Sequence, residues 1–208
     1  MASPSVLERP KDPLDELRAP RNEIRLLTIP EHRFVMIDGS GPPGPAAFEP
    51  RIPGLYGLAY PLRFALKRRG IEGKVGPLEG LWWTTDGIVD LDEIFGGGDR
   101  ETWRWTLMIG LPGEAMDAEL AEHLAAAREK LDPAVAPSLR VEPFDEGPCA
   151  QTMHVGPYAD ERPTIERLFA GIAEAGLRPR GRHHELYLGD PQRSAPERLR
   201  TILRQPVE

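Results

Sequence analysis

Apolar residues recur at helical spacing in three segments of the chain. In residues 164–175 they occupy positions i, i+3, i+4, i+7 and i+8, namely Ile165, Leu168, Phe169, Ile172 and Ala173. This spacing places them on one face of an α-helix. The same periodicity predicts helices over residues 56–69 and 116–131, the first of which stops at Gly70. We therefore expect three amphipathic helices, each with one buried face.

Short runs of β-branched and aromatic residues predict the β-strands. Glycine and proline bound these runs, as is common for strands, and the runs cover residues 23–27, 34–37, 78–84, 102–109, 139–144, 149–155, 184–188 and 201–203. Residues 39–54 hold so many glycines and prolines that they are predicted to form a loop. Residues 1–22 are polar and interrupted by proline, which predicts a flexible N-terminal arm with one helical turn near residues 14–17.

The order of the predicted elements repeats along the chain. A strand, a helix and two strands occur within residues 23–112 and again within residues 139–208, and the helix at 116–131 joins the two repeats. This order predicts a single α+β domain over residues 23–208, built from tandem duplicated strand–helix–strand–strand modules. The modules are expected to form antiparallel sheet with the helices packed on one side. A central ligand cleft is expected between them, since ligand sites are common at such junctions.

Composition and charge narrow the class of protein. Glycine and proline number 21 and 23, yet 40% apolar residues and four tryptophans among 208 residues indicate a folded chain. A net charge of −7 without a long basic run disfavours a nucleic-acid partner. No signal peptide and no apolar run of the roughly 18 residues needed for a membrane span are visible. We expect a cytoplasmic protein without a membrane or nucleic-acid partner, whose oligomeric state has no readable signature.

Several familiar motifs fail on chemical grounds. Residues 39–44 fit the dinucleotide-binding pattern of glycines, but the prolines around them have no N–H to donate to a phosphate. The glycines at 96–98 lack the lysine and hydroxyl residue of a phosphate loop. His183 and Glu185 share one strand face but are too few to favour a metal site. Cys149 is predicted to be a buried structural thiol. No cofactor and no metal are therefore expected.

Glu185 is the most informative polar residue. On a strand, alternation places Glu185 on the same side as Tyr187, whereas His184 faces away. If this face lines the cleft, a carboxylate lies in an aromatic pocket, where it either pairs with a ligand cation or acts as a general base with a raised pKa. The alternative interpretation is a solvated glutamate on an edge strand.

Aromatic residues add to this picture. All four tryptophans fall within residues 82–105, which favours an aromatic site for a flat or cationic ligand, although core packing is an equal alternative. Trp82 and Trp83 face opposite sides of one strand, so one of them is expected in the core. His154 and Tyr158 lie at a strand end and in the following loop, where functional residues are common.

Five motifs, met in order along most of the chain, resemble the GyrI-like small-molecule-binding family. They are FVMIDGSG (34–41), LYGLAY (55–60), PLEGLWW (77–83), QTMHVGPY (151–158) and HHELYLGDP (183–191). The resemblance is strongest to the stand-alone branch of the family and extends to the tail at 195–207. It implies the tandem-module fold, a cleft for bulky aromatic and often cationic compounds, and a central glutamate that matches Glu185.

The resemblance leaves two functions open. One is a module that binds hydrophobic, aromatic or cationic compounds in xenobiotic sequestration or sensing. The other is a cofactor-independent hydrolase that detoxifies cyclopropane-bearing genotoxic natural products. In the second case Glu185 activates water, while Tyr158 or Tyr187 assists the developing oxyanion. The residues expected to contact a ligand are Trp82, Trp83, His154, Tyr56, Tyr60 and Trp105.

Overall fold

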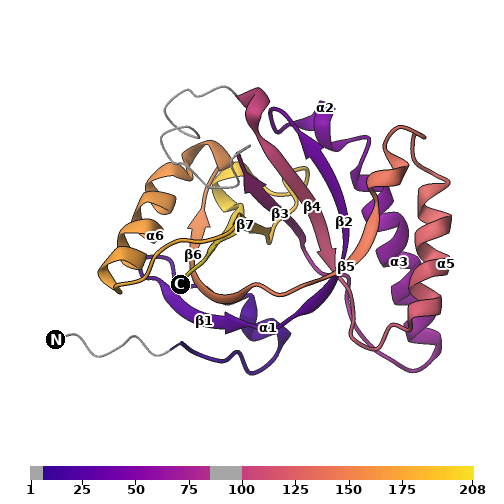
Figure 1. The fold of residues 1–208 in the computed structure, drawn as a ribbon, viewed down its shortest axis with the longest axis horizontal. Coiled ribbons are helices and arrows are strands. Elements are labelled where there is room, and N and C mark those ends of the chain that lie inside the picture. Colours follow the sequence, from indigo (N-terminus) through magenta and orange to yellow (C-terminus); the bar gives the residue numbers. More distant parts are fainter. Residues whose placement is uncertain (1–6, 85–99) are drawn as a thin grey trace. The chain divides into compact units, whose positions relative to one another are not determined.

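The computed structural model describes residues 7–84 and 100–208 (Figure 1). The predicted loop glycines at 96–98 lie outside the described residues. The chain divides into two compact units. Unit 1 comprises Met1–Glu31, Leu81–Asp99 and Asp145–Glu208, and unit 2 comprises His32–Gly80 and Arg100–Phe144.

Unit 1 is an antiparallel sheet with one long helix. Its elements are α1 (Pro13–Glu16), β1 (Arg25–Ile29), β6 (Gly147–Val155), α6 (Arg162–Glu174), β7 (His183–Tyr187) and β8 (Arg200–Pro206). The strands are hydrogen-bonded in the order β1-β6-β8-β7, and every pair is antiparallel. Helix α6 contacts β6 and β8, and it runs beside these strands in Figure 1. The helix predicted over residues 164–175 is therefore present, two residues earlier at its start.

Different groups of residues pack on the two faces of the unit 1 sheet. On one face the apolar side of α6 packs against Ala150 of β6 and Leu203 of β8. On the other face Leu27 and Ile29 of β1 pack against Cys149, which confirms the predicted buried thiol. Residues that pair across an antiparallel ladder point to the same side of the sheet. The residue pairs between adjacent strands therefore show which face each side chain is on.

Unit 2 combines three antiparallel strands with two long helices. Its elements are β2 (His32–Ser40), α2 (Pro45–Phe48), α3 (Ile52–Arg68), β4 (Arg104–Gly110), α5 (Asp117–Arg128) and β5 (Arg140–Phe144). Strand β2 pairs with both β4 and β5. Helices α3 and α5 lie side by side (Figure 1), and α3 also contacts β2 and β4. Strand β3 (Leu78–Trp83) contributes its first half to unit 2 and its second half to unit 1.

Strands β1 and β5 each pair within one unit but are followed in the chain by a strand of the other unit. Strand β1 is followed directly by β2 of unit 2, yet β1 pairs with β6. Strand β5 is followed directly by β6 of unit 1, yet β5 pairs with β2. The units therefore differ from the two continuous repeats predicted at 23–112 and 139–208, because each unit includes a strand from outside its own repeat.

The loop prediction for residues 39–54 was wrong in part. Strand β2 continues to Ser40, α2 begins at Pro45, and α3 begins at Ile52 with Pro53 in its first turn. Proline is well tolerated at the first positions of a helix because the N–H it lacks has no intrahelical partner there. Counting prolines as loop residues therefore hid two helix starts.

The described part of the N-terminal arm is docked within unit 1. The backbone of Glu8 bonds to Leu26 and Thr28 of β1. The carbonyl of Glu16 accepts hydrogen bonds from Gln151 and Arg204. These contacts attach residues of the arm to β1, β6 and β8, so the arm from residue 7 onward is part of the folded unit.

The fold class is α+β, as the sequence predicted, with antiparallel strands and helices packed on them. The central cleft expected between the modules stays a prediction. No helix in the described ranges 7–84 and 100–208 is long and apolar enough to cross a membrane.

Candidate functional site

Strand β7 carries the candidate site on the face that α6 covers. Glu185 pairs with Leu203 in the ladder with β8, and Tyr187 pairs with Thr201. Leu203 packs against α6, so Glu185 lies on the same face of the sheet. His184 pairs with Arg204 and points to the opposite face, as strand alternation predicted.

Glu185 is a largely buried carboxylate held by a tyrosine. Only 15% of its side chain is exposed. The hydroxyl of Tyr187 donates a hydrogen bond of 2.8 Å to its Oε2. Burial raises the pKa of Glu185 to about 7, against the opposing effects of that hydrogen bond and of nearby His184. Glu185 is therefore a carboxylate that exchanges a proton near neutral pH, which is the property of a general base.

His183 leaves this carboxylate without a charged partner. Its Nε2 lies 3.9 Å from Oε1 of Glu185. Burial lowers the pKa of His183 to about 4, so the ring is neutral at physiological pH and does not form an ion pair. Its Nδ1 lies 3.4 Å from Oε1 of Gln205. In the described ranges Glu185 therefore accepts a hydrogen bond from the neutral Tyr187 hydroxyl and forms no ion pair with His183.

A second buried carboxyl lies at the start of α6. Glu161 is 5% exposed, and its Oε1 has no hydrogen-bond partner among the residues that the structure describes. Burial first, and then the charge of Glu185, raise the pKa of Glu161 to about 9, with Thr201 acting in the opposite direction. The sequence interpretation missed Glu161, because an acidic residue before a helix is an ordinary helix-terminal residue.

Aromatic side chains lie close to Glu185. The rings of Tyr158 and Tyr187 meet edge to face, with centroids 5.6 Å apart. Tyr158 is 39% exposed, whereas Trp82 is buried. The indole of Trp82 is close enough to Tyr187 to act on the pKa of its hydroxyl, although burial and the charge of Glu185 raise that pKa well above 10. The structure thus brings together four predicted site residues: Glu185, Tyr187, Tyr158 and Trp82.

His154 contacts the loop and the helix next to the site. Its Nε2 lies 3.1 Å from the carbonyl oxygen of Pro157, and its Nδ1 lies 3.1 Å from Oγ1 of Thr164 on α6. Burial lowers the pKa of His154, which favours the neutral ring. The carbonyl can only accept, so Nε2–H donates to it and Nδ1 accepts from the threonine hydroxyl. His154 is buried and fixes the loop that carries Tyr158.

The other predicted aromatic residues make contacts of different kinds. The guanidinium of Arg182 lies 3.8 Å from the ring centroid of Trp83, a cation–π contact. Tyr56 and Tyr60 belong to unit 2, where their rings stack at 5.7 Å. Trp105 is fully buried in unit 2, and its Nε1 donates to the carbonyl of Gly41. Trp105 therefore packs in the core of its own unit.

The opposite face of the unit 1 sheet holds a buried ion-pair network. Arg204 donates to Oε2 of Glu146 at 2.9 Å, and His184 Nδ1 lies 2.8 Å from Oε1 of the same carboxylate. Burial alone would raise the pKa of Glu146, but the charges of His184 and Arg204 hold that pKa at about 2. Arg204 also donates to Gln151 and to the carbonyl of Glu16. This network is fully paired and anchors the N-terminal arm.

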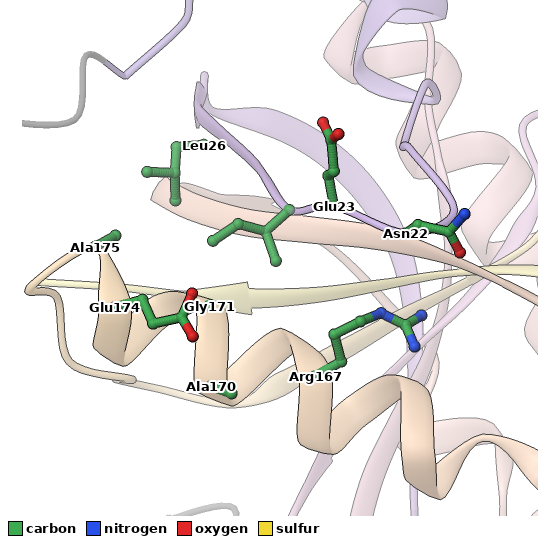
Figure 2. A pocket seen from close by; sticks show the side chains of 9 residues that line it. Asn22, Glu23, Leu26, Arg167, Ala170, Gly171, Glu174 and Ala175 are labelled. Atoms are coloured by element: carbon green, nitrogen blue, oxygen red, sulfur yellow. The ribbon is translucent and has the colours of Figure 1, made fainter.

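A separate groove of about 500 Å³ lies between α6 and the segment leading into β1 (Figure 2). Its floor on α6 is made of small residues, among them Ala170 and Gly171. Arg167 lines one end and points towards Asn22 in Figure 2, and it donates to the carbonyl of Arg21 at 3.0 Å. The charged side chains of this groove are exposed, and none of the predicted site residues lines it.

The fold and site together define a small-molecule-binding domain of α+β type. Residues 106–208 match the model of the GyrI-like small molecule binding domain. An uncharacterized conserved protein from Listeria innocua is 32% identical in its crystal structure, with a TM-score of 0.78 over 97% of this chain and 100% of that chain. The chain belongs to the GyrI-like family, which confirms the resemblance read from its motifs.

Two further structures resemble this chain. A crystal structure described as a hydrolase from Listeria innocua is 30% identical, with a TM-score of 0.73 over 97% of this chain and 100% of that chain. The C-terminal domain of EcmrR is only 12% identical, with a TM-score of 0.53 over 89% of this chain and 97% of that chain, so it shares the fold alone. No protein of curated function matches the sequence.

Proposed function

We propose that this protein binds hydrophobic aromatic molecules and hydrolyses them, with Glu185 as the general base. The observation that carries the proposal is a largely buried carboxylate of raised pKa, hydrogen-bonded by Tyr187 and bordered by Tyr158 and Trp82. The substrate class implied by the family resemblance is compounds with a strained cyclopropane ring. Similarity over nearly the full chain to a Listeria innocua protein described as a hydrolase supports the same choice.

In this reaction Glu185 accepts a proton from water while the water oxygen forms a bond to a ring carbon. The strained carbon–carbon bond breaks, and its electron pair moves to a conjugated carbonyl oxygen of the substrate, which then takes up a proton. Tyr187 already donates to Glu185, so it orients the base. Tyr158 is then the tyrosine that donates a hydrogen bond to the developing oxyanion. Trp82 and Tyr158 provide aromatic surface for a planar substrate.

A second candidate function is binding without turnover. Neither Glu185 nor Glu161 has an arginine or lysine partner among the described residues, so a ligand cation would supply the missing charge. Buried carboxylates are stabilised by such pairing. This observation favours cationic aromatic compounds and a role in sequestering or sensing xenobiotics.

The two functions are separated by one experiment. The purified full chain is incubated with a cyclopropane-bearing alkylating agent, and ring opening with addition of water is followed by mass spectrometry. We expect turnover in the wild type, loss of turnover with retained binding in Glu185→Gln, and unchanged turnover in the control Glu166→Gln. Glu166 is a suitable control because it is half exposed and pairs with Arg162 at the surface. Stoichiometric binding without product would instead establish the second candidate.

A further inference from the structure

Glu161 and Glu185 form a pair of neighbouring buried carboxyls in which the two members have different surroundings. Glu185 accepts a hydrogen bond from Tyr187 and is 15% exposed. Glu161 is 5% exposed and leaves Oε1 without a partner in the described ranges. We propose that Glu161 is the general acid of the site, a protonated carboxyl that donates its proton to the substrate oxygen that receives the electron pair. This inference rests on the proposed hydrolytic function and adds a catalytic residue to it.

The contrast with Glu146 shows why Glu161 carries a proton. Both side chains are almost fully buried on the unit 1 sheet. Glu146 accepts from Arg204 and lies within hydrogen-bond distance of His184, so its charge is compensated. In the described ranges no arginine or lysine compensates Glu161, and an uncompensated buried carboxylate is strongly disfavoured. A buried carboxyl in this position takes up a proton instead.

Glu161 is also not used as a helix cap. It occupies the residue before α6, where a carboxylate would ordinarily accept from the first free N–H groups of the helix. Its side chain makes no capping hydrogen bond. The backbone carbonyl of Glu161 accepts from Thr164 and Ile165, so the helix start is formed without the side chain. The carboxyl is therefore not engaged in capping the helix.

The groups that face Glu161 keep its proton in place. From β7 the charge of Glu185 raises the pKa of Glu161, in addition to the effect of burial, and from β8 Thr201 acts in the opposite direction. The two carboxyls also raise the pKa values of the tyrosines. Burial first, and then the charges of Glu161, Glu185 and Asp190, raise the pKa of Tyr158, and burial and Glu185 raise that of Tyr187. Both tyrosines are consequently weaker acids than Glu161, which makes Glu161 the group that gives up a proton and the tyrosines the groups that only hydrogen-bond.

The proton balance of the cycle follows from this pair. Before reaction the pair holds one proton, on Glu161. Glu185 gains a proton from the attacking water, and Glu161 loses its proton to the substrate oxygen, so the pair again holds one proton after ring opening. Transfer from Glu185 to Glu161 restores the starting state. The net reaction adds one water to the substrate, and no other reactant is needed.

The protonation of Glu161 can be measured without substrate. Infrared spectroscopy of the full chain carrying carboxyl-labelled glutamate detects the carbonyl band of a protonated carboxyl. At pH 8 we expect one such band in the wild type and in the control Glu166→Gln, and none in Glu161→Gln. In Glu185→Gln the midpoint at which the band disappears should move to lower pH. Absence of the band in the wild type, or its persistence in Glu161→Gln, would overturn the assignment.

Kinetics then test the acid role with the cyclopropane-bearing alkylating agent. We expect Glu161→Gln to lower kcat about 100-fold, a typical general-acid contribution, and to remove the alkaline limb of the pH–rate profile. An alkaline limb that persists in Glu161→Gln would refute the acid role. The infrared spectra of wild type and Glu185→Gln decide the protonation even if Glu161→Gln folds poorly. Failure of wild-type turnover removes the hydrolytic function, whereas a missing band removes only the assignment of Glu161.

Discussion

The hydroxyl of Tyr187 donates a hydrogen bond of 2.8 Å to Oε2 of Glu185, two residues earlier on the same strand. Residues at i and i+2 share one face of a strand, so the backbone of β7 sets this contact without help from a loop. The hydrogen bond stabilises the ionised form of Glu185 and so acts against burial, which raises the pKa of that carboxyl.

Tyr187→Phe should therefore raise the pKa of Glu185. We expect the acidic limb of the pH–rate profile to move to higher pH and turnover at pH 6 to fall about 10-fold, as expected for roughly one pKa unit. Steady-state rates measured as a function of pH provide the check. In the matched variant Tyr158→Phe the acidic limb should stay in place, because Tyr158 is not hydrogen-bonded to Glu185. An acidic limb that does not move in Tyr187→Phe would contradict this prediction.

The two site carboxyls should weaken the fold as the pH rises. Their pKa values, about 9 for Glu161 and about 7 for Glu185, lie above the value of 4.5 for an unburied glutamate. Between pH 4.5 and these values the folded state binds more protons than the unfolded chain, so the stability present below pH 4.5 is lost as the pH increases.

Glu161→Gln should consequently stabilise the protein at alkaline pH. Glutamine is neutral at every pH, so the gain should be on the order of 1–3 kcal/mol at pH 8 and should vanish near pH 4. Urea unfolding at the two pH values measures it, with Glu166→Gln as a surface control. If Glu161→Gln destabilised the protein equally at both pH values, the wild-type side chain would have a packing role only.

Arg204→Met should destabilise unit 1 strongly. It removes the guanidinium that donates to Glu146, Gln151 and the carbonyl of Glu16. Breaking a buried pair in this way commonly costs about 3–5 kcal/mol. The control Arg178→Met removes an exposed pair with Glu208 at 3.6 Å and should change stability by less than about 1 kcal/mol. If the two variants had the same urea midpoint, the network would contribute nothing to the free energy of unfolding.

The same network predicts acid sensitivity of the wild type. The charges of His184 and Arg204 hold the pKa of Glu146 at about 2, below the free value of 4.5. The unfolded chain therefore binds more protons in this range, and the stabilisation present above pH 4.5 is lost as the pH falls towards 2. Unfolding free energies measured from pH 5 to pH 2 should decline more steeply in the wild type than in Glu146→Gln.

Gly39→Ala should destabilise unit 2. A Cβ at residue 39 would lie 2.0 Å from a ring atom of Trp105, which is fully buried. Overpacking of this kind costs about 1–3 kcal/mol or more. The control Gly73→Ala places its Cβ in open space and should have a small effect. Thermal unfolding of both variants measures the difference, and equal midpoints would mean that Trp105 moves aside freely.

Local patterns were sufficient for much of this molecule. The apolar spacing of residues 164–175 predicted α6, and alternation along β7 correctly separated Glu185 and Tyr187 from His184. The five family motifs predicted the α+β fold. These features depend on residues within one element, where periodicity is readable.

Long-range contacts account for what the sequence did not show. Glu161 is 24 positions from Glu185, and nothing in its own neighbourhood distinguishes it from an exposed helix-terminal acid. The arm was expected to be flexible because the partner of Glu16, Arg204, is 188 positions away. Trp105 was assigned to ligand binding from its proximity in sequence to other tryptophans, whereas its burial is set by contacts with Gly39 and Phe48.

The exchange of edge strands between the repeats has a consequence for synthesis on the ribosome. Unit 2 has its last strand once residue 144 has emerged, so its sheet can form while the chain is still growing. Strand β1 emerges much earlier, but its partner β6 begins only at Gly147. Strand β1 therefore stays without its ladder partner until β6 has been synthesised, and its backbone groups are unpaired in the growing chain during that interval.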